Sequence, residues 1–109
     1  MGWLLRDGEV LASLEVAGTR SARRRGLLGR SELDGALLLD PARSVHSFGM
    51  RFPIDVAWLD GDLTVLRTCH LARNRLTRPV LAARSVLEAE AGSFARWELH
   101  VGDQLERTD

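Results

Sequence analysis

The sequence predicts a mainly β domain, an α+β arrangement at most: a compact β-sandwich or a partly closed barrel of antiparallel hairpins with one or two short helices. Turn signals recur about every ten residues, as they do in sandwiches and barrels. The segments between them are short, and they are either apolar or alternate between apolar and polar residues. No long segment has the helical periodicity needed to cover a parallel sheet. The chain has 109 residues, so we expect residues 1–109 to form a single domain.

An N-terminal hairpin is predicted by Asp7-Gly8, which follows the short apolar segment 3–6. This dipeptide is a preferred two-residue hairpin loop because both positions accept positive φ angles. Residues 10–16 then alternate between apolar and polar side chains, as in a half-buried strand.

A short helix is predicted over residues 20–25. The Thr19 hydroxyl can accept a hydrogen bond from an N–H group of the first turn, and Gly26 can end the helix in the left-handed conformation. Arg23-Arg24-Arg25 then lie in the last turn, where the helix dipole favours cations.

The remainder of the chain is predicted to contain short strands and a second helix. The predicted strands are residues 36–39, 44–48, 54–59, 63–71 and 85–91, followed by a final strand that reaches Leu105. Asp60-Gly61-Asp62 is the strongest hairpin signal in the chain. Gly92-Ser93 can begin a short helix over residues 94–99, and residues 73–79 are expected to form a polar loop.

The composition argues against several classes of protein. Fifteen basic residues, all of them arginine, balance fifteen acidic residues, so we expect no nucleic-acid partner and no anionic membrane partner. Cys69 is the single cysteine, which excludes an internal disulfide. No apolar segment is long enough to span a membrane and the N-terminus has no secretory apolar region, so we expect a cytoplasmic protein.

The most informative segment is 46–60, an apolar stretch that carries His46, Arg51, Asp55 and Asp60. Ionisable groups in a buried strand are normally paired with one another or used in a function. This segment is therefore the first candidate for a site.

The length of the turn at residues 60–62 decides what faces Asp55. A two-residue loop puts Asp55 across from Leu66 or Thr68, with His70 nearby, on a mixed face suited to lining a pocket. A three-residue loop would put Arg67 and Cys69 on that face instead. The opposite face, where we expect the core, carries Ile54, Val56 and Trp58.

Arg51 and Asp55 form a candidate pair. On a straight strand they would be roughly 13 Å apart, and a bend at Pro53 could bring them together. The pair could then serve a ligand or only stabilise the bend. His46 alternates with apolar neighbours, so it is either a core-facing histidine or a ligand contact.

A second group of candidates combines arginines with glutamates. The arginines are Arg20, Arg23, Arg24, Arg25 and Arg30. They form either a solvated helix end or an anion site, since guanidinium groups pair well with phosphate and carboxylate. Glu88 and Glu90 share one strand face, where they could pair with these arginines or act as a general acid and base.

We expect no metal site and no cofactor. A zinc or iron site made of His46, His70 and Asp55 is conceivable, but no close ligand doublet supports it. Cys69 and His70 are adjacent on a strand and therefore point to opposite faces. Cys69 also lacks the local signature of a catalytic nucleophile.

Three motifs make the chain resemble the uncharacterised DUF192 (UPF0127) family. They are Arg23-Arg24-Arg25-Gly26-Leu27-Leu28-Gly29-Arg30 with Leu33, the segment 46–60, and Val86-Leu87-Glu88 through Ala91-Gly92 with Val101-Gly102-Asp103. The resemblance covers about Val10 to Leu105 and implies a small β-rich domain of sandwich or barrel type. The family positions that it carries over are Arg25, Gly26, Arg30, Phe48, Met50, Arg51, Asp55, Asp60 and Glu88. It names no reaction.

Three functional hypotheses follow. The first is a binding module whose polar pocket holds a small polar ligand or a peptide, with candidate contacts Arg51, Asp55, His46, His70, Arg25, Arg30 and Glu88. The second is a hydrolase- or isomerase-type enzyme in which Asp55 or His46 acts as base and Arg51 as electrostatic stabiliser. It requires Asp55 and His46 to face one cavity. The third is a structural or partner-interaction domain, in which these polar groups only stabilise the fold.

Overall fold

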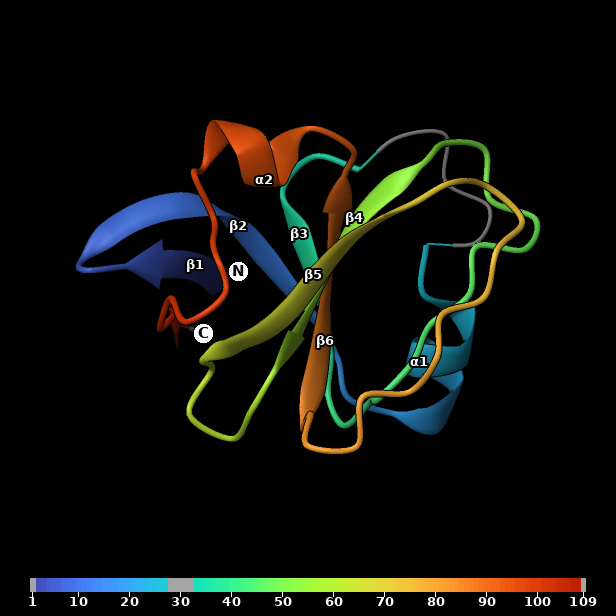
Figure 1. Ribbon diagram of the computed structural model, residues 1–109, viewed down its shortest axis with the longest axis horizontal. Coiled ribbons are helices and arrows are strands. Elements are labelled where there is room, and N and C mark those ends of the chain that lie inside the picture. The colour runs from blue at the N-terminus through green and yellow to red at the C-terminus, as the bar shows by residue number, and fades with distance from the viewer. Residues whose placement is uncertain (1, 28–32, 109) are drawn as a thin grey trace.

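A computed structural model describes residues 2–27 and 33–108 and confirms the mainly β prediction (Figure 1). Seven strands form one sheet in the order β5-β4-β6-β3-β2-β1-β7, with two short helices. The elements are β1 (Gly2–Arg6), β2 (Glu9–Ala17), α1 (Arg20–Arg25), β3 (Ala36–Leu39), β4 (Ile54–Leu59), β5 (Val65–Leu71), β6 (Ser85–Glu90), α2 (Ser93–Arg96) and β7 (Glu106–Thr108).

The first hairpin and the first helix lie where local signals predict them. Asp7 and Gly8 connect β1 to β2 with φ angles of 53° and 79°, as their two-residue loop requires. Thr19 Oγ1 accepts a hydrogen bond from Ala22 N at the start of α1, and Gly26 follows the last helical residue with φ of 48°. These elements depend on neighbouring residues only, which is why a short window of sequence identifies them.

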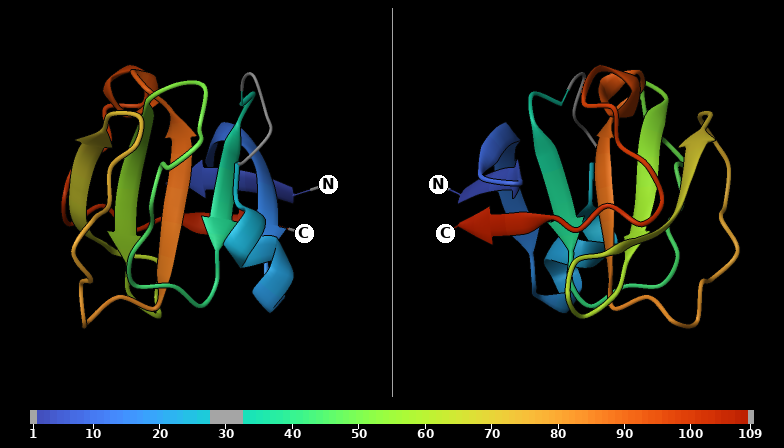
Figure 2. Two further views of the ribbon diagram at one scale, coloured as in Figure 1. Left: turned by 90° about the vertical axis from the view of Figure 1, so that its right-hand side faces the viewer. Right: turned by 60° about the vertical axis from the view of Figure 1, so that its left-hand side comes forward.

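The sheet is mixed and strongly curved, and it is not closed (Figure 2). β2 and β3 pair in parallel, and the other neighbouring strands pair antiparallel. Residues 102–105, which lead into β7, bind the start of edge strand β5: Val65 N donates to Asp103 O at 2.8 Å, and Leu105 N donates to Leu63 O at 2.9 Å. These hydrogen bonds connect the start of edge strand β5 to the segment that precedes the other edge strand, β7.

Apolar side chains cover both faces of the sheet. All six residues of β4 are buried, and they alternate between two cores. Ile54, Val56 and Trp58 belong to the first core, as predicted, which packs under α1 and the long loops. Ala57 and Leu59 belong to the second core, on the side of α2. Asp55 lies between Ile54 and Val56 on the strand, so its side chain points to the opposite face, where the second core lies.

The register of β4 and β5 corrects the prediction for Asp55. Asp55 lies across from His70, not from Leu66 or Thr68. The connection is longer than two residues, because the Asp60 carboxylate accepts hydrogen bonds from Asp62 N at 2.9 Å and Thr64 N at 3.0 Å. Because the register shifts between Trp58 and Leu59, Thr68 and His70 stay on the face of Asp55 as predicted. Leu66, which was predicted on that face, instead packs against the first core, and Val65 packs in the second.

Three predicted elements differ from the structure. Within residues 44–48 only His46 pairs, through an isolated bridge to Leu76. The second helix is Ser93–Arg96, shorter than the predicted 94–99. The last strand is Glu106–Thr108, beyond Leu105. Neither helix in the described ranges 2–27 and 33–108 is long and apolar enough to cross a membrane.

Candidate functional site

The sheet carries two buried carboxylates on neighbouring strands, and they point to opposite faces. Asp55 on β4 pairs with His70 and Ala89 and faces the second core. Glu88 on β6 pairs with Val56 and faces the first core. Only 8% of Asp55 and 2% of Glu88 is exposed. The surroundings of each group decide which of them is available to a ligand.

Both oxygens of the Asp55 carboxylate contact other protein groups. Its Oδ2 atom accepts hydrogen bonds from Gly92 N at 3.0 Å and Phe94 N at 3.1 Å, which are the N–H groups at the start of α2. Its Oδ1 atom lies 3.5 Å from His70 Nδ1. Asp55 therefore attaches α2 to the sheet by satisfying N–H groups that a helix start leaves free.

Two predicted partnerships of Asp55 are not formed. Arg51 is exposed, and it is not among the groups that contact the Asp55 carboxylate. His46 lines a pocket on the other face of the sheet, which Asp55 does not line. The acid–base pair of Asp55 and His46 with Arg51 is thus not assembled, because the alternation of β4 turns Asp55 away from that pocket.

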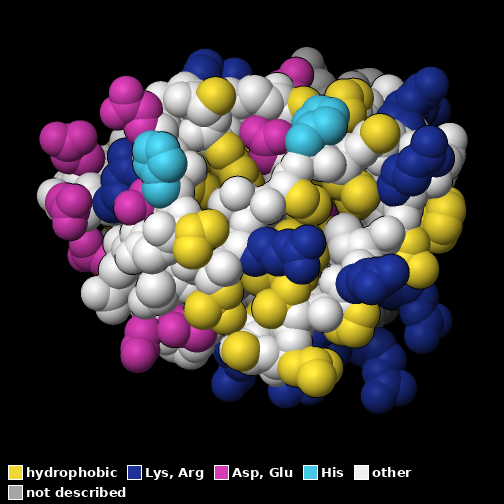
Figure 3. Space-filling view, in the orientation of Figure 1, with side chains coloured by type: hydrophobic (Ala, Val, Ile, Leu, Met, Phe, Trp, Pro, Cys, Tyr) yellow, Lys and Arg dark blue, Asp and Glu magenta, His cyan; other side chains and the backbone are white. Residues whose placement is uncertain are grey.

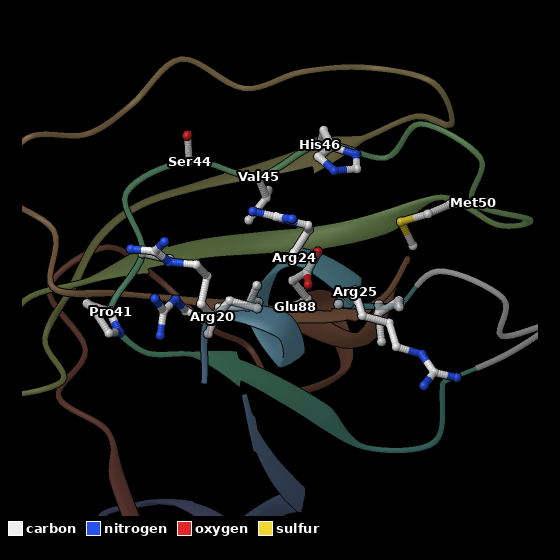
Figure 4. A pocket seen from close by; sticks show the side chains of 14 residues that line it. Arg20, Arg24, Arg25, Pro41, Ser44, Val45, His46, Met50 and Glu88 are labelled. Carbon is white, nitrogen blue, oxygen red and sulfur yellow. The ribbon is translucent and has the colours of Figure 1, made fainter. Parts of the chain in front are cut away.

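The pocket on the first face has a volume of about 350 Å³ (Figure 4). It lies between α1, the chain that follows β3, and the middle of β6. Its lining residues are Arg20, Arg23, Arg24, Arg25, Gly26, Leu27, Leu39, Pro41, Ala42, Ser44, Val45, His46, Met50 and Glu88. Three of the candidate ligand contacts, Arg25, His46 and Glu88, are brought together here.

Glu88 forms the floor of this pocket, since it lies on a central strand while α1 and the loop stand above it. Burial raises the pKa of Glu88 from 4.5 to about 7. Within residues 2–27 and 33–108 no group forms a hydrogen bond or ion pair with its carboxyl group. A Cβ atom at Gly26 would lie 3.6 Å from Glu88 Oε1, so the start of the loop after α1 packs directly against the carboxyl group.

The rim of the pocket carries the arginines of α1. Arg23 donates to Gly18 O at 2.6 Å. Arg20, Arg24 and Arg25 are exposed and form no hydrogen bond or ion pair within the described part of the chain. Arg24 extends across the pocket towards Val45 and His46, whereas Arg25 points away from Glu88 (Figure 4). The pairing of Glu88 with these arginines, one of the sequence-based alternatives, is not formed.

His46 contributes an aromatic ring to the rim. Its ring stacks on that of Phe48 with centroids 5.5 Å apart and an angle of 24° between the planes. Phe48 N also donates to His46 Nδ1 at 3.3 Å, which fixes the ring of His46 beside the pocket. Arg30, the remaining candidate of the arginine cluster, lies outside the described residues.

The apolar part of the pocket was not predicted from the sequence. Leu27, Leu39, Val45 and Met50 line it, and each of them also belongs to the first core. No local pattern separates an apolar pocket wall from ordinary core, since both are simply buried. These side chains line a pocket because residues 41–50 pass over the sheet and leave a space between themselves and α1.

Metal and thiol chemistry find no support in the described residues. No group of three or more His, Cys, Asp or Glu side chains there could hold a metal ion. Cys69 faces the first core beside Val56, while His70 faces Asp55, so the two point to opposite faces as predicted. Burial raises the pKa of the Cys69 thiol, which disfavours the reactive thiolate.

Comparison with known proteins places these features in a family. The model of the DUF192 family, described as "Uncharacterized ACR", matches residues 3–107. A UPF0127 protein of Thermococcus kodakarensis is 32% identical over 101 residues, which are 87% of this chain and 64% of that protein. A UPF0127 protein of Thermococcus gammatolerans is 33% identical over 98 residues, 84% of this chain and 64% of that protein. The chain thus spans 64% of the length of these relatives.

Two crystal structures share the fold. A protein of unknown function from Novosphingobium aromaticivorans superposes with a TM-score of 0.81 at 21% identity, over 96% of this chain and 82% of the other. A putative transcription regulator from Sinorhizobium meliloti superposes with a TM-score of 0.79 at 24% identity, over 97% and 91% of the two chains. At these identities the likeness concerns the fold alone.

Proposed function

Since the chain belongs to the DUF192 (UPF0127) family, whose function is not established, we propose from its geometry that it is a small-molecule-binding module. The binding site is the pocket between α1, residues 41–50 and β6. One observation carries this proposal: the Glu88 carboxyl is buried on the pocket floor, and no protein group in the described ranges binds it.

A buried carboxyl without a partner lowers the stability of a fold. Transfer of a charged carboxylate out of water costs several kcal/mol unless hydrogen bonds or an opposite charge replace its hydration. An apolar residue at this position would fill the first core without that cost. A group of this kind, lining a pocket with a strongly raised pKa, is a typical candidate for ligand binding.

The unpaired arginines on the rim support the same proposal. Guanidinium groups bind carboxylate and phosphate through paired N–H donors, and those of Arg20 and Arg24 are free to do so. In Figure 3 the basic side chains gather on the right, over the end of the molecule that holds α1, and acidic side chains gather on the left. This charge distribution would steer an anionic group towards the pocket.

The other hypotheses receive less support. The enzyme that uses Asp55, His46 and Arg51 requires groups that lie apart, so we do not propose it. A structural or partner-interaction domain is the outcome expected if the pocket stays empty in the experiment below. A cytoplasmic location without a nucleic-acid partner stays a prediction of the sequence.

A ligand screen by two-dimensional NMR tests the proposal. The protein, labelled with nitrogen-15, is titrated with a library of small polar molecules, and we expect saturable shifts in the amides of residues 23–27 and 44–50. Glu88→Gln should weaken binding at least tenfold, whereas Glu90→Gln, an exposed position two residues along the same strand, should not. If no compound shifts these amides, or if Glu88→Gln binds as the wild type does, the proposal is wrong.

A further inference from the structure

The pocket separates negative from positive charge. Glu88, the acidic group that lines it, lies on the floor, while four arginines lie on α1 at the rim. Burial is the cause of the raised pKa of Glu88, and the arginines do not hold it down. None of these guanidinium groups forms an ion pair with the Glu88 carboxyl within the described residues, so a ligand can engage the floor and the rim at the same time.

Apolar side chains line the same pocket as the two charged groups. Leu39 and Val45 line the pocket together with Met50, whose side chain points inward in Figure 4. The methylene groups of a ligand in the pocket would bury favourably against these side chains.

From this arrangement we infer that the pocket binds a zwitterion in which an apolar spacer separates an ammonium group from a carboxylate. The ammonium pairs with Glu88 on the floor, and the carboxylate pairs with Arg24 and Arg20 on the rim. The inference rests on the proposed function and specifies the class of ligand. A simple anion would leave Glu88 buried without a partner, and a simple cation would be repelled by the arginines at the entrance.

Simple probes of matched shape test this inference. The ω-amino acids from 3-aminopropanoate to 8-aminooctanoate are compared with the unsubstituted carboxylate and the primary amine of the same chain length, by NMR titration at pH 8. We expect the best ω-amino acid to bind at least tenfold tighter than either of its singly charged counterparts. The length at the optimum then measures the separation between Glu88 and the rim.

Two variants assign the two ends. Glu88→Gln should reduce the affinity for the best ω-amino acid to that of the plain carboxylate, whose own affinity stays unchanged. Arg24→Gln should weaken the binding of the ω-amino acid and of the carboxylate alike. Arg107 is an exposed arginine on β7, and Arg107→Gln should weaken the binding of neither.

The pH dependence gives an independent readout. The ammonium needs an ionised Glu88, so affinity at pH 6 should be about tenfold lower than at pH 8. The other charged groups that face Glu88 in the pocket are the four arginines of α1, which do not titrate in this range, and His46. The pH dependence should persist in His46→Gln and disappear in Glu88→Gln.

The outcomes separate the inference from the proposed function. If the amine binds as tightly as every ω-amino acid, or if only other library compounds shift the pocket amides, and Glu88→Gln weakens that binding at least tenfold, the pocket is a binding site but not for zwitterions. If the plain carboxylate binds as tightly as every ω-amino acid and Glu88→Gln leaves its affinity unchanged, both the inference and the proposed function are wrong. If neither the library nor the probes shift these amides, both the inference and the proposed function are wrong. Tighter binding of an ω-amino acid with loss in Glu88→Gln supports both.

Discussion

Asp55 and Glu88 are buried carboxylates on adjacent strands of one sheet, yet their surroundings differ completely. Asp55 receives two backbone N–H groups at the start of α2 and lies beside His70. Glu88 lies in a pocket and is bound by no group in residues 2–27 and 33–108. The comparison shows that burial of a charge does not by itself indicate function. A carboxylate whose hydrogen bonds are satisfied belongs to the fold, and one left without partners is available to a ligand.

The largest effect is expected from Asp55→Ala. Removal of the carboxylate leaves the N–H groups of Gly92 and Phe94 without an acceptor, so we expect a loss of about 3 kcal/mol in the free energy of unfolding. Urea unfolding followed by tryptophan fluorescence measures it, and the buried Trp58 is a suitable probe.

Asp55→Asn provides the matched control for charge. The amide oxygen can still accept from the backbone, so the loss should be clearly smaller, about 1–2 kcal/mol. If both variants are as stable as the wild type, the hydrogen bonds of Asp55 do not stabilise α2, and the structural role assigned to Asp55 is wrong.

Glu88→Gln should raise the free energy of unfolding, whereas the Asp55 substitutions lower it. Because the pKa of Glu88 is raised to about 7 in the folded protein, its carboxyl stays protonated there while the unfolded chain ionises near 4.5. The wild type therefore loses stability as the pH rises from about 4.5 to 7, and the loss is complete above 7. We expect the variant to be more stable than the wild type by about 3 kcal/mol at pH 8 and equal to it below pH 4.5.

Unfolding midpoints between pH 4 and pH 8 check this prediction, with Glu90→Gln as the control on the same strand. Because Glu90 is exposed, Glu90→Gln should leave the pH dependence of the unfolding midpoint unchanged. A destabilised Glu88→Gln at pH 8 would mean that Glu88 has a structural partner after all, as Asp55 does.

Thr19→Ala extends the comparison to the two helix starts. At the start of α1, the neighbouring Thr19 hydroxyl accepts a hydrogen bond from the first turn. At the start of α2, the acceptor is Asp55, which lies on the distant strand β4. We expect a loss of about 1 kcal/mol, smaller than for Asp55→Ala because only one local hydrogen bond disappears. Thr19→Ser should retain most of the stability, and equal losses in Ser and Ala would exclude the hydroxyl as the cause.

The smallest effect is expected from His70→Gln. The His70 side chain is 58% exposed, and solvent screens its interaction with Asp55. A loss of about 0.5 kcal/mol would fit a solvent-screened contact with Asp55. A loss as large as that of Asp55→Ala would instead make His70 the main partner of the carboxylate.

Elements encoded by neighbouring residues were predictable. Asp7-Gly8 specifies the first hairpin, and Thr19 with Gly26 specifies both ends of α1. The alternation along β4 also identified which side chains face the first core. In each case the interaction that decides the structure joins residues close in the chain, so the sequence alone contains it.

The partners of the charged groups were harder to predict. The pairing of Asp55 with His70 depends on the hydrogen bonds of the Asp60 carboxylate within the turn and on the register shift near Trp58, which no strand pattern reveals. The sequence does place Glu88 among the candidates, but the arginines of α1 that it offers as partners form no ion pair with Glu88 in residues 2–27 and 33–108.

The sequence by itself determined the mainly β class, the first hairpin, the boundaries of α1 and the two faces of β4, because these follow from the chemistry of adjacent residues and from strand alternation. The tertiary structure alone decided that Asp55 is satisfied by α2 and that Glu88 is not satisfied by anything described. That difference arises from how residues 40–50 and 92–94 fold back over opposite faces of the sheet, and contacts between distant segments leave no local pattern in the chain.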